Sequence, residues 1–119
     1  MNVTIYHNPR CSKSRNTLQL LRDRGIEPKI VEYLAAPPTA ARLNQILGLL
    51  GMSPRELMRK GEAAYGDQGL ADPSLGDNAL VAAMVASPVL IERPVVVVRD
   101  ARGERAALGR PPEKVLAIL

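Results

Sequence analysis

Apolar residues recur along the chain with two different periods, which predict strands alternating with helices. Residues 2–6 alternate β-branched and polar side chains, as a short strand does. Residues 14–25 place Leu18 and Leu21 on one side of a predicted helix. Residues 28–34 return to a strand pattern. The beginning of the chain therefore predicts a βαβ unit with a parallel pair of strands.

The middle of the chain, about residues 36–92, predicts a helical insertion between the second and third strands. Its first helix is expected to be capped by Thr39, and its apolar residues keep the i, i+3, i+4, i+7 spacing of a buried stripe. The run Ser53-Pro54-Arg55-Glu56 has the pattern of a capping box with proline at the first helical position. Residues 61–76 are rich in glycine and predict a loop or short turns, and Asp77 is expected to cap a further helix.

The last part of the chain predicts a hairpin and a final helix. Val95–Val98 is a run of valines, expected in a strand that is buried on both faces. Asp100–Gly103 predicts a turn, Glu104–Leu108 a returning strand, and residues 113–119 a helix. The order βαβ, helical insertion, ββα predicts an α/β protein with a thioredoxin/glutaredoxin-like fold. We expect residues 1–119 to form one domain of this kind.

Composition narrows the chemistry that this fold can carry. The chain has 119 residues, with 46% hydrophobic residues but no Phe or Trp, so its core must be aliphatic. A single cysteine excludes an intrachain disulfide, and one cysteine with one histidine cannot complete a tetrahedral zinc site. We therefore expect no metal. The N-terminus lacks a signal-peptide pattern and no apolar run approaches the ~20 residues of a membrane span, so we expect a soluble cytoplasmic protein.

The excess of positive charge is consistent with two kinds of ligand. The net charge is +4, and most of the cations are arginines scattered along the chain. Basic proteins bind nucleic acid through phosphates, but single-strand binders also need aromatic platforms, and the chain offers only three tyrosines. The planar fork of arginine also suits small oxyanions. Composition favours an oxyanion over nucleic acid as the ligand.

The residues around Cys11 indicate that it has a chemical role. It lies in a polar loop between the first strand and the first helix, where unpaired backbone N–H groups and the helix dipole favour a thiolate. His7, Arg10, Lys13 and Arg15 add nitrogen-bearing or positive side chains within four residues. The same amides would bind an anion. A buried structural cysteine is the alternative, but the polar neighbours favour a reactive thiol.

The sequence around Cys11 resembles that of a known family. The run Tyr6–Leu18 (YHNPRCSKSRNTL) is similar to the active-site loop of the ArsC family, the glutaredoxin-coupled arsenate reductases, and especially to its shorter chromosomal branch. The likeness extends through Arg55–Lys60, Ile91–Val98 and Gly109–Leu119, and so covers essentially the whole chain. The family has a thioredoxin-like fold, which agrees with the predicted order of elements.

The resemblance implies a role for each matched residue. Cys11 would be the nucleophile that attacks arsenate, with His7 and Ser14 holding it as thiolate. Pro94 would be the cis-proline that faces the cysteine. The implied oxyanion-binding residues are all arginines: Arg59, Arg93, Arg110 and, in the loop itself, Arg15.

The electron balance requires a second thiol. Reduction of arsenate to arsenite takes two electrons, and a disulfide supplies them, yet the chain has one cysteine. Cys11-Ser12-Lys13-Ser14 is a C-x-x-C motif without its resolving cysteine. The resemblance implies glutathione as co-substrate and glutaredoxin as partner. We expect no bound cofactor and a monomeric protein.

Two other functions remain open. One is a glutathione-linked thiol oxidoreductase with a substrate other than arsenate. The other is an Spx-like transcriptional regulator that binds RNA polymerase, a related fold that serves as a docking surface. Such a regulator would not need the three matched arginines Arg59, Arg93 and Arg110 together with C-x-x-S, so their presence favours the enzyme.

Overall fold

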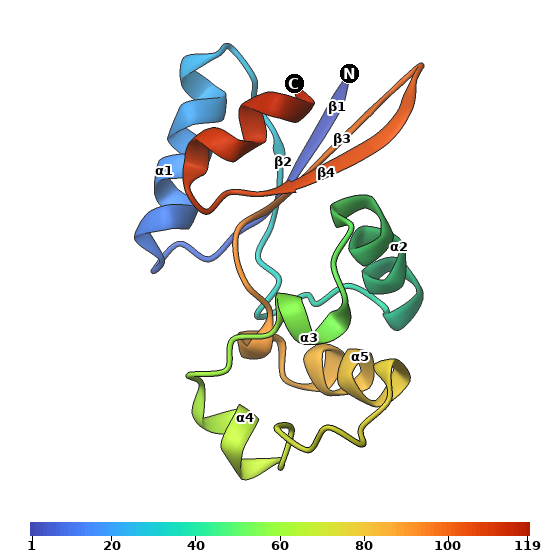
Figure 1. The fold of residues 1–119 in the computed structure, drawn as a ribbon. Helices are drawn as coiled ribbons and strands as arrows, with labels where there is room; N and C mark the ends of the chain where they lie inside the picture. The colour runs from blue at the N-terminus through green and yellow to red at the C-terminus, as the bar shows by residue number, and fades with distance from the viewer. The chain divides into compact units, whose positions relative to one another are not determined.

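The computed structural model describes residues 1–119 and contains a four-stranded sheet with helices (Figure 1). The chain divides into two compact units. The first unit comprises Met1–Ala36 and Arg93–Leu119 and holds the sheet, and the second comprises Pro37–Glu92 and holds helices. That residues 1–119 form one domain stays a prediction. No helix has the length and apolar character needed to cross a membrane.

The sheet has the strand order β2-β1-β3-β4. Its strands are β1 (Asn2–Tyr6), β2 (Lys29–Val31), β3 (Val95–Asp100) and β4 (Gly103–Leu108). β1 pairs with β2 in parallel, whereas the β1–β3 and β3–β4 pairs are antiparallel. A parallel pair needs a crossover, and the helix between β1 and β2 supplies it. The predicted βαβ unit and C-terminal hairpin are confirmed, and the fold is thioredoxin-like.

Two helices pack on the same face of this sheet, α1 (Ser12–Asp23) and the 3₁₀ helix η2 (Pro112–Ile118). They are in contact with each other and lie side by side in Figure 1. The cluster between helices and sheet is aliphatic and comprises Val3, Ile5, Leu18, Leu21, Val96, Val98, Val115 and Ile118. All four valines of Val95–Val98 are buried, as the uninterrupted apolar run predicts. This packing fixes the start of α1, and therefore Cys11, relative to the sheet.

The second unit is built from short helices. They are α2 (Ala40–Leu50), α3 (Pro54–Leu57), α4 (Ala63–Asp67), α5 (Asp77–Ala86) and the 3₁₀ helix η1 (Pro88–Leu90). The predicted caps are confirmed for two of them: the Thr39 hydroxyl accepts the N–H of Arg42, and Ser53 and Glu56 form a reciprocal capping box. After α3, an isolated bridge pairs Met58 with Ile91. Residues 57–62 are thereby tied to the end of the same unit.

Several predicted boundaries were wrong. α1 begins two residues early, at Ser12, and β2 is shorter than residues 28–34, because the Glu32 carbonyl accepts two turn N–H groups. Asp77 does not cap α5: Gly76 is the N-cap and Asp77 is the first helical residue, where its charge still favours the helix dipole. The 61–76 segment contains the short helix α4, and the last helix begins one residue earlier than predicted, at Pro112.

Candidate active site

Cys11 occupies the N-cap of α1 with an extended backbone. Its N–H donates to the carbonyl of Asn8 (3.0 Å), and its carbonyl accepts the N–H of Arg15 (3.0 Å), which begins the helix. The thiol is half-buried, and its side chain makes no capping bond. The N–H groups of the first turn are thus left to point at the sulfur.

The surroundings of the Cys11 sulfur favour the thiolate. Burial by itself raises the pKa of the thiol. Opposing this, the backbone N–H of Ser14, the guanidinium of Arg93 and the backbone N–H of Lys13 each favour the charged sulfur and lower its pKa. These groups outweigh burial, so the pKa of Cys11 lies below its ordinary value.

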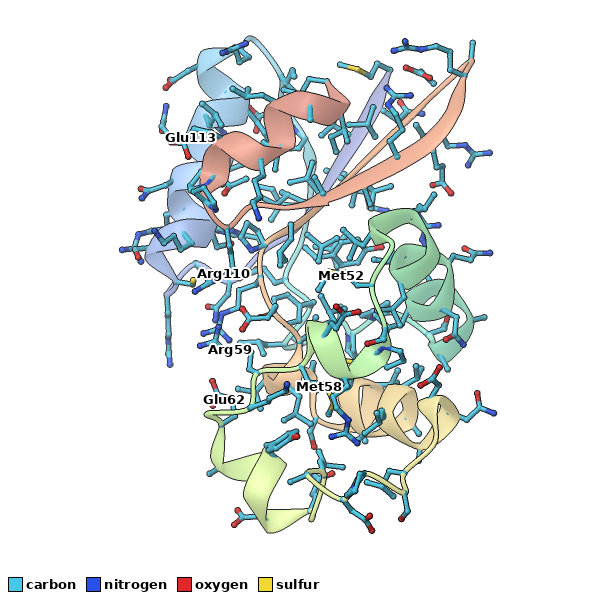
Figure 2. All side chains as sticks on the ribbon, in the orientation of Figure 1. Met52, Met58, Arg59, Glu62, Arg110 and Glu113 are labelled. Carbon is cyan, nitrogen blue, oxygen red and sulfur yellow. The ribbon has the colours of Figure 1, made fainter.

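The structure brings Arg93 and Arg110 to this thiol. Nη1 of Arg110 lies 3.9 Å from the Cys11 sulfur and donates to the carbonyl of Arg93 at 3.1 Å. Figure 2 shows Arg110 beyond the end of β4, close to the start of α1. Both arginines precede a cis peptide bond, Arg93–Pro94 and Arg110–Pro111. Two arginines from distant parts of the chain therefore face one thiol.

His7 and Ser14 form a buried pair beside the loop. Nδ1 of His7 lies 2.6 Å from the Ser14 hydroxyl, which also accepts the N–H of Asn8 at 3.0 Å. Burial lowers the pKa of His7, Glu32 partly offsets this, and nearby arginines reinforce it. The ring is therefore neutral at pH 7, and Ser14 can donate its proton to Nδ1. Because the backbone N–H of Ser14 helps to lower the pKa of Cys11, His7 is linked to Cys11 through Ser14.

Arg15 and Arg59 are placed differently from Arg93 and Arg110. Nη1 of Arg15 donates to the carbonyl of Pro9 (3.0 Å) and so braces the loop. Arg59 belongs to the second unit, where Figure 2 shows it next to Glu62. Its guanidinium forms ion pairs with Glu62 and with Glu92, each at 3.1 Å. The oxyanion-binding role of Arg59 stays a prediction.

Thr17 and Gly109 are two site residues that the sequence reasoning missed. Thr17 is fully buried on α1, and its hydroxyl donates to the Lys13 carbonyl at 2.8 Å, with the Gly109 carbonyl at 3.4 Å. A Cβ at Gly109 would lie 2.5 Å from Thr17 Oγ1 and 2.9 Å from Cγ of Pro94. The glycine thus allows three segments to meet just before Arg110. Its only sequence signal is its position directly before a matched arginine.

Side chains that could together bind a metal ion would be those of His, Cys, Asp and Glu. No group of three or more His, Cys, Asp or Glu side chains is placed to hold a metal ion. The chemistry that the arrangement can support is that of one activated thiol beside cations, which suits attack on an electrophilic oxyanion.

The sheet order, the cysteine at the N-cap of the first helix and the cis peptide bond before Pro94 define a single-cysteine protein with a thioredoxin-like fold. The model of the ArsC family matches residues 6–118. The chain therefore belongs to the ArsC family.

Relatives are similar over nearly the whole chain. The uncharacterized protein YfgD of Escherichia coli K12 is 56% identical over 98% of this chain and 96% of its own length. An arsenate reductase of Rhizobium meliloti is 47% identical over 100% of this chain and 82% of its own. The solved structure of an arsenate reductase from Vibrio cholerae has a TM-score of 0.92 and 48% identity, over 100% of this chain and 98% of that one.

Proposed function

We propose that this protein reduces arsenate to arsenite through Cys11, with glutathione and glutaredoxin as electron donors. The observation that carries the proposal is the thiol of lowered pKa at the start of α1, faced by Arg93 and Arg110. Relatives named arsenate reductase, 47% and 48% identical over the full chain, support the same substrate.

The proposed reaction begins with the Cys11 thiolate. It attacks arsenic, a sulfur–arsenic bond forms, and one arsenate oxygen leaves as water after protonation. The thiol of glutathione then attacks the Cys11 sulfur, and the sulfur–arsenic bonding pair stays on arsenic. Arsenic(V) becomes arsenic(III) and leaves as arsenite, while the two thiols are oxidised to a Cys11–glutathione disulfide. A glutaredoxin thiolate then takes the glutathionyl group by thiol–disulfide exchange and releases the Cys11 thiolate.

Each matched residue has a place in this scheme. Arg93 and Arg110 bind the oxyanion and stabilise the charge that develops during attack, with Arg59 as the third cation. His7 and Ser14 keep the first turn of α1 aimed at the sulfur, Arg15 braces the loop, and Pro94 borders the site. No bound cofactor takes part, and we propose that the protein acts as a cytoplasmic monomer.

An external thiol follows from the composition. Cys11 is the one cysteine of the chain, so no second cysteine can resolve an intermediate by forming an intrachain disulfide. This supports glutathione and glutaredoxin rather than an intrachain disulfide that thioredoxin would reduce.

A coupled assay tests the proposal directly. Arsenate-dependent oxidation of NADPH is measured with glutathione, glutaredoxin and glutathione reductase, and separately with thioredoxin and thioredoxin reductase. We expect turnover in the first system, little in the second, and none with Cys11→Ser. Absence of arsenate turnover by the wild-type protein, or equal turnover by Cys11→Ser, would refute the proposed arsenate reductase activity. Arsenate-independent turnover with glutathionylated substrates would instead indicate an oxidoreductase of another substrate.

A further inference from the structure

A cavity of about 300 Å³ lies beside the loop that carries Cys11. One wall is the loop from His7 to Arg10, and the other is the segment after β2, with Glu32, Leu34 and Ala35. Arg10 directly precedes the nucleophile, and the carbonyl of Asn8 holds the N–H of Cys11. The cavity therefore shares its wall with the reactive loop.

Charges of opposite sign line this cavity. Arg10 brings a guanidinium and Glu32 a carboxylate, and both residues are exposed. The two side chains do not form an ion pair with each other, so each can bind another molecule. Leu34, 44% exposed, adds an apolar surface between polar neighbours. A ligand that carries both an ammonium and a carboxylate would be complementary to this lining.

His7 adds a buried polar group to the same wall. The side chain is 6% exposed, and its Nδ1 is taken up by Ser14. When the ring is neutral and Nδ1 accepts the Ser14 proton, Nε2 carries the ring hydrogen and is the remaining donor of His7. A ring N–H donor on a residue that lines a cavity is complementary to a ligand with a carbonyl or carboxylate oxygen.

We propose that this cavity binds the charged backbone of a small peptide thiol and holds its sulfur for reaction with Cys11. Glu32 takes the ligand ammonium, Arg10 takes a carboxylate, and His7 Nε2–H donates to an oxygen of the peptide. The identity of that peptide as glutathione rests on the proposed function. Binding next to the nucleophile makes the second thiol step effectively intramolecular, which raises its rate.

Thiol–disulfide exchange with two disulfides tests this site without arsenate. The Cys11 thiolate attacks glutathione disulfide, one glutathione thiolate leaves, and a Cys11–glutathione disulfide forms. Hydroxyethyl disulfide undergoes the same exchange but carries no charge. Mass spectrometry follows both rates. Their ratio removes any general effect of a substitution on the reactivity of Cys11, because that effect acts on both reactions.

We expect Glu32→Gln and Arg10→Gln each to lower the ratio of the glutathione disulfide rate to the hydroxyethyl disulfide rate by about threefold, as the loss of an exposed ion pair implies. The double variant should lose about tenfold. Glu113→Gln and Arg99→Gln make the same charge changes at exposed positions outside the cavity and should leave the ratio unchanged.

Other results overturn the proposal. A ratio that stays at the wild-type value in the double variant means that the cavity does not bind the peptide. If the ratio falls in Arg10→Gln but stays at the wild-type value in Glu32→Gln, the cavity binds only an anion. The outcome is separable from that of the proposed function: selective glutathionylation without arsenate turnover leaves the cavity proposal standing, and arsenate turnover with unaltered ratios leaves only the reductase.

Discussion

The guanidinium of Arg110 lies 3.9 Å from the Cys11 sulfur although 99 positions separate the two residues in the chain. The same Nη1 also donates to the carbonyl of Arg93, whose own guanidinium lowers the pKa of the thiol. One backbone carbonyl thus orients Arg110 while a second arginine approaches the sulfur. The two arginines form one cation-rich wall whose geometry depends on both.

The first prediction concerns the acidity of Cys11. We expect alkylation by iodoacetamide to follow an apparent pKa below the ordinary value of about 8.5. As the pH rises through this lowered pKa the reactive thiolate accumulates, so the protein is already modified rapidly near pH 7. Arg93→Met should raise the pKa, because a group that favours the charged sulfur is lost. A wild-type pKa at or above about 8.5 would contradict the prediction that Cys11 is an activated thiolate.

A second prediction separates the charge of Arg110 from its geometry. Arg110→Lys keeps a cation but loses the planar fork that reaches both Cys11 and the Arg93 carbonyl. Loss of a hydrogen bond to a charged group costs about 1.5–3 kcal/mol, so kcat/KM for arsenate should fall about tenfold or more. Arg99→Lys, an exposed position on β3, is the matched control and should stay near wild type. Equal values for the two variants would show that Arg110 acts by charge alone or not at all.

Local patterns allowed much of the fold to be predicted. The Ser53–Glu56 capping box, the Thr39 cap and the buried run Val95–Val98 depend on neighbouring residues, and all three are present. The cap of α5 was assigned to Asp77 wrongly, because Gly76 can enter a helix from extended backbone without any side-chain bond. Cap preferences are statistical where several residues can satisfy the same N–H groups.

The candidate site was predictable only in part. Cys11 could be found from its loop, because the helix start and the neighbouring cations are adjacent in sequence. Arg93 and Arg110 lie far from it in the chain, and only the likeness to a family singled them out. The approach of Gly109 to Thr17 spans 92 positions and depends on the absence of a side chain, so no periodicity or motif predicts it.

The third prediction tests the close contact between Gly109 and Thr17 by enlarging the first residue and shortening the second. Gly109→Ala places a Cβ 2.5 Å from Thr17 Oγ1, and such overpacking costs about 1–3 kcal/mol of the free energy of unfolding. Thr17→Ala removes the two nearest Thr17 atoms, so the double variant should recover part of the loss relative to the sum of the single changes. Chemical denaturation measures the free energy, and iodoacetamide alkylation reports whether Cys11 stays activated.

Gly48→Ala is the control for this prediction. Gly48 is exposed within α2, and a Cβ there meets nothing within 4 Å. Alanine should therefore stabilise the helix by about 0.5–1 kcal/mol, opposite in sign to Gly109→Ala. If Gly109→Ala were as stable as wild type, the close contact with Thr17 would not constrain the segment before Arg110.

The last prediction follows from the lowered pKa of His7. Burial disfavours the imidazolium, so below the unfolded value of about 6.5 the unfolded chain binds a proton more readily than the folded chain. This contribution to stability is present above pH 6.5 and is lost as the pH falls below it, towards the lowered folded pKa. His7 is the single histidine, so His7→Gln should lower stability at pH 7.5, through loss of the Ser14 bond, yet flatten its decline between pH 6.5 and 5. Urea midpoints of both proteins across this range measure the effect, and parallel declines would mean that His7 titrates alike in the folded and unfolded states.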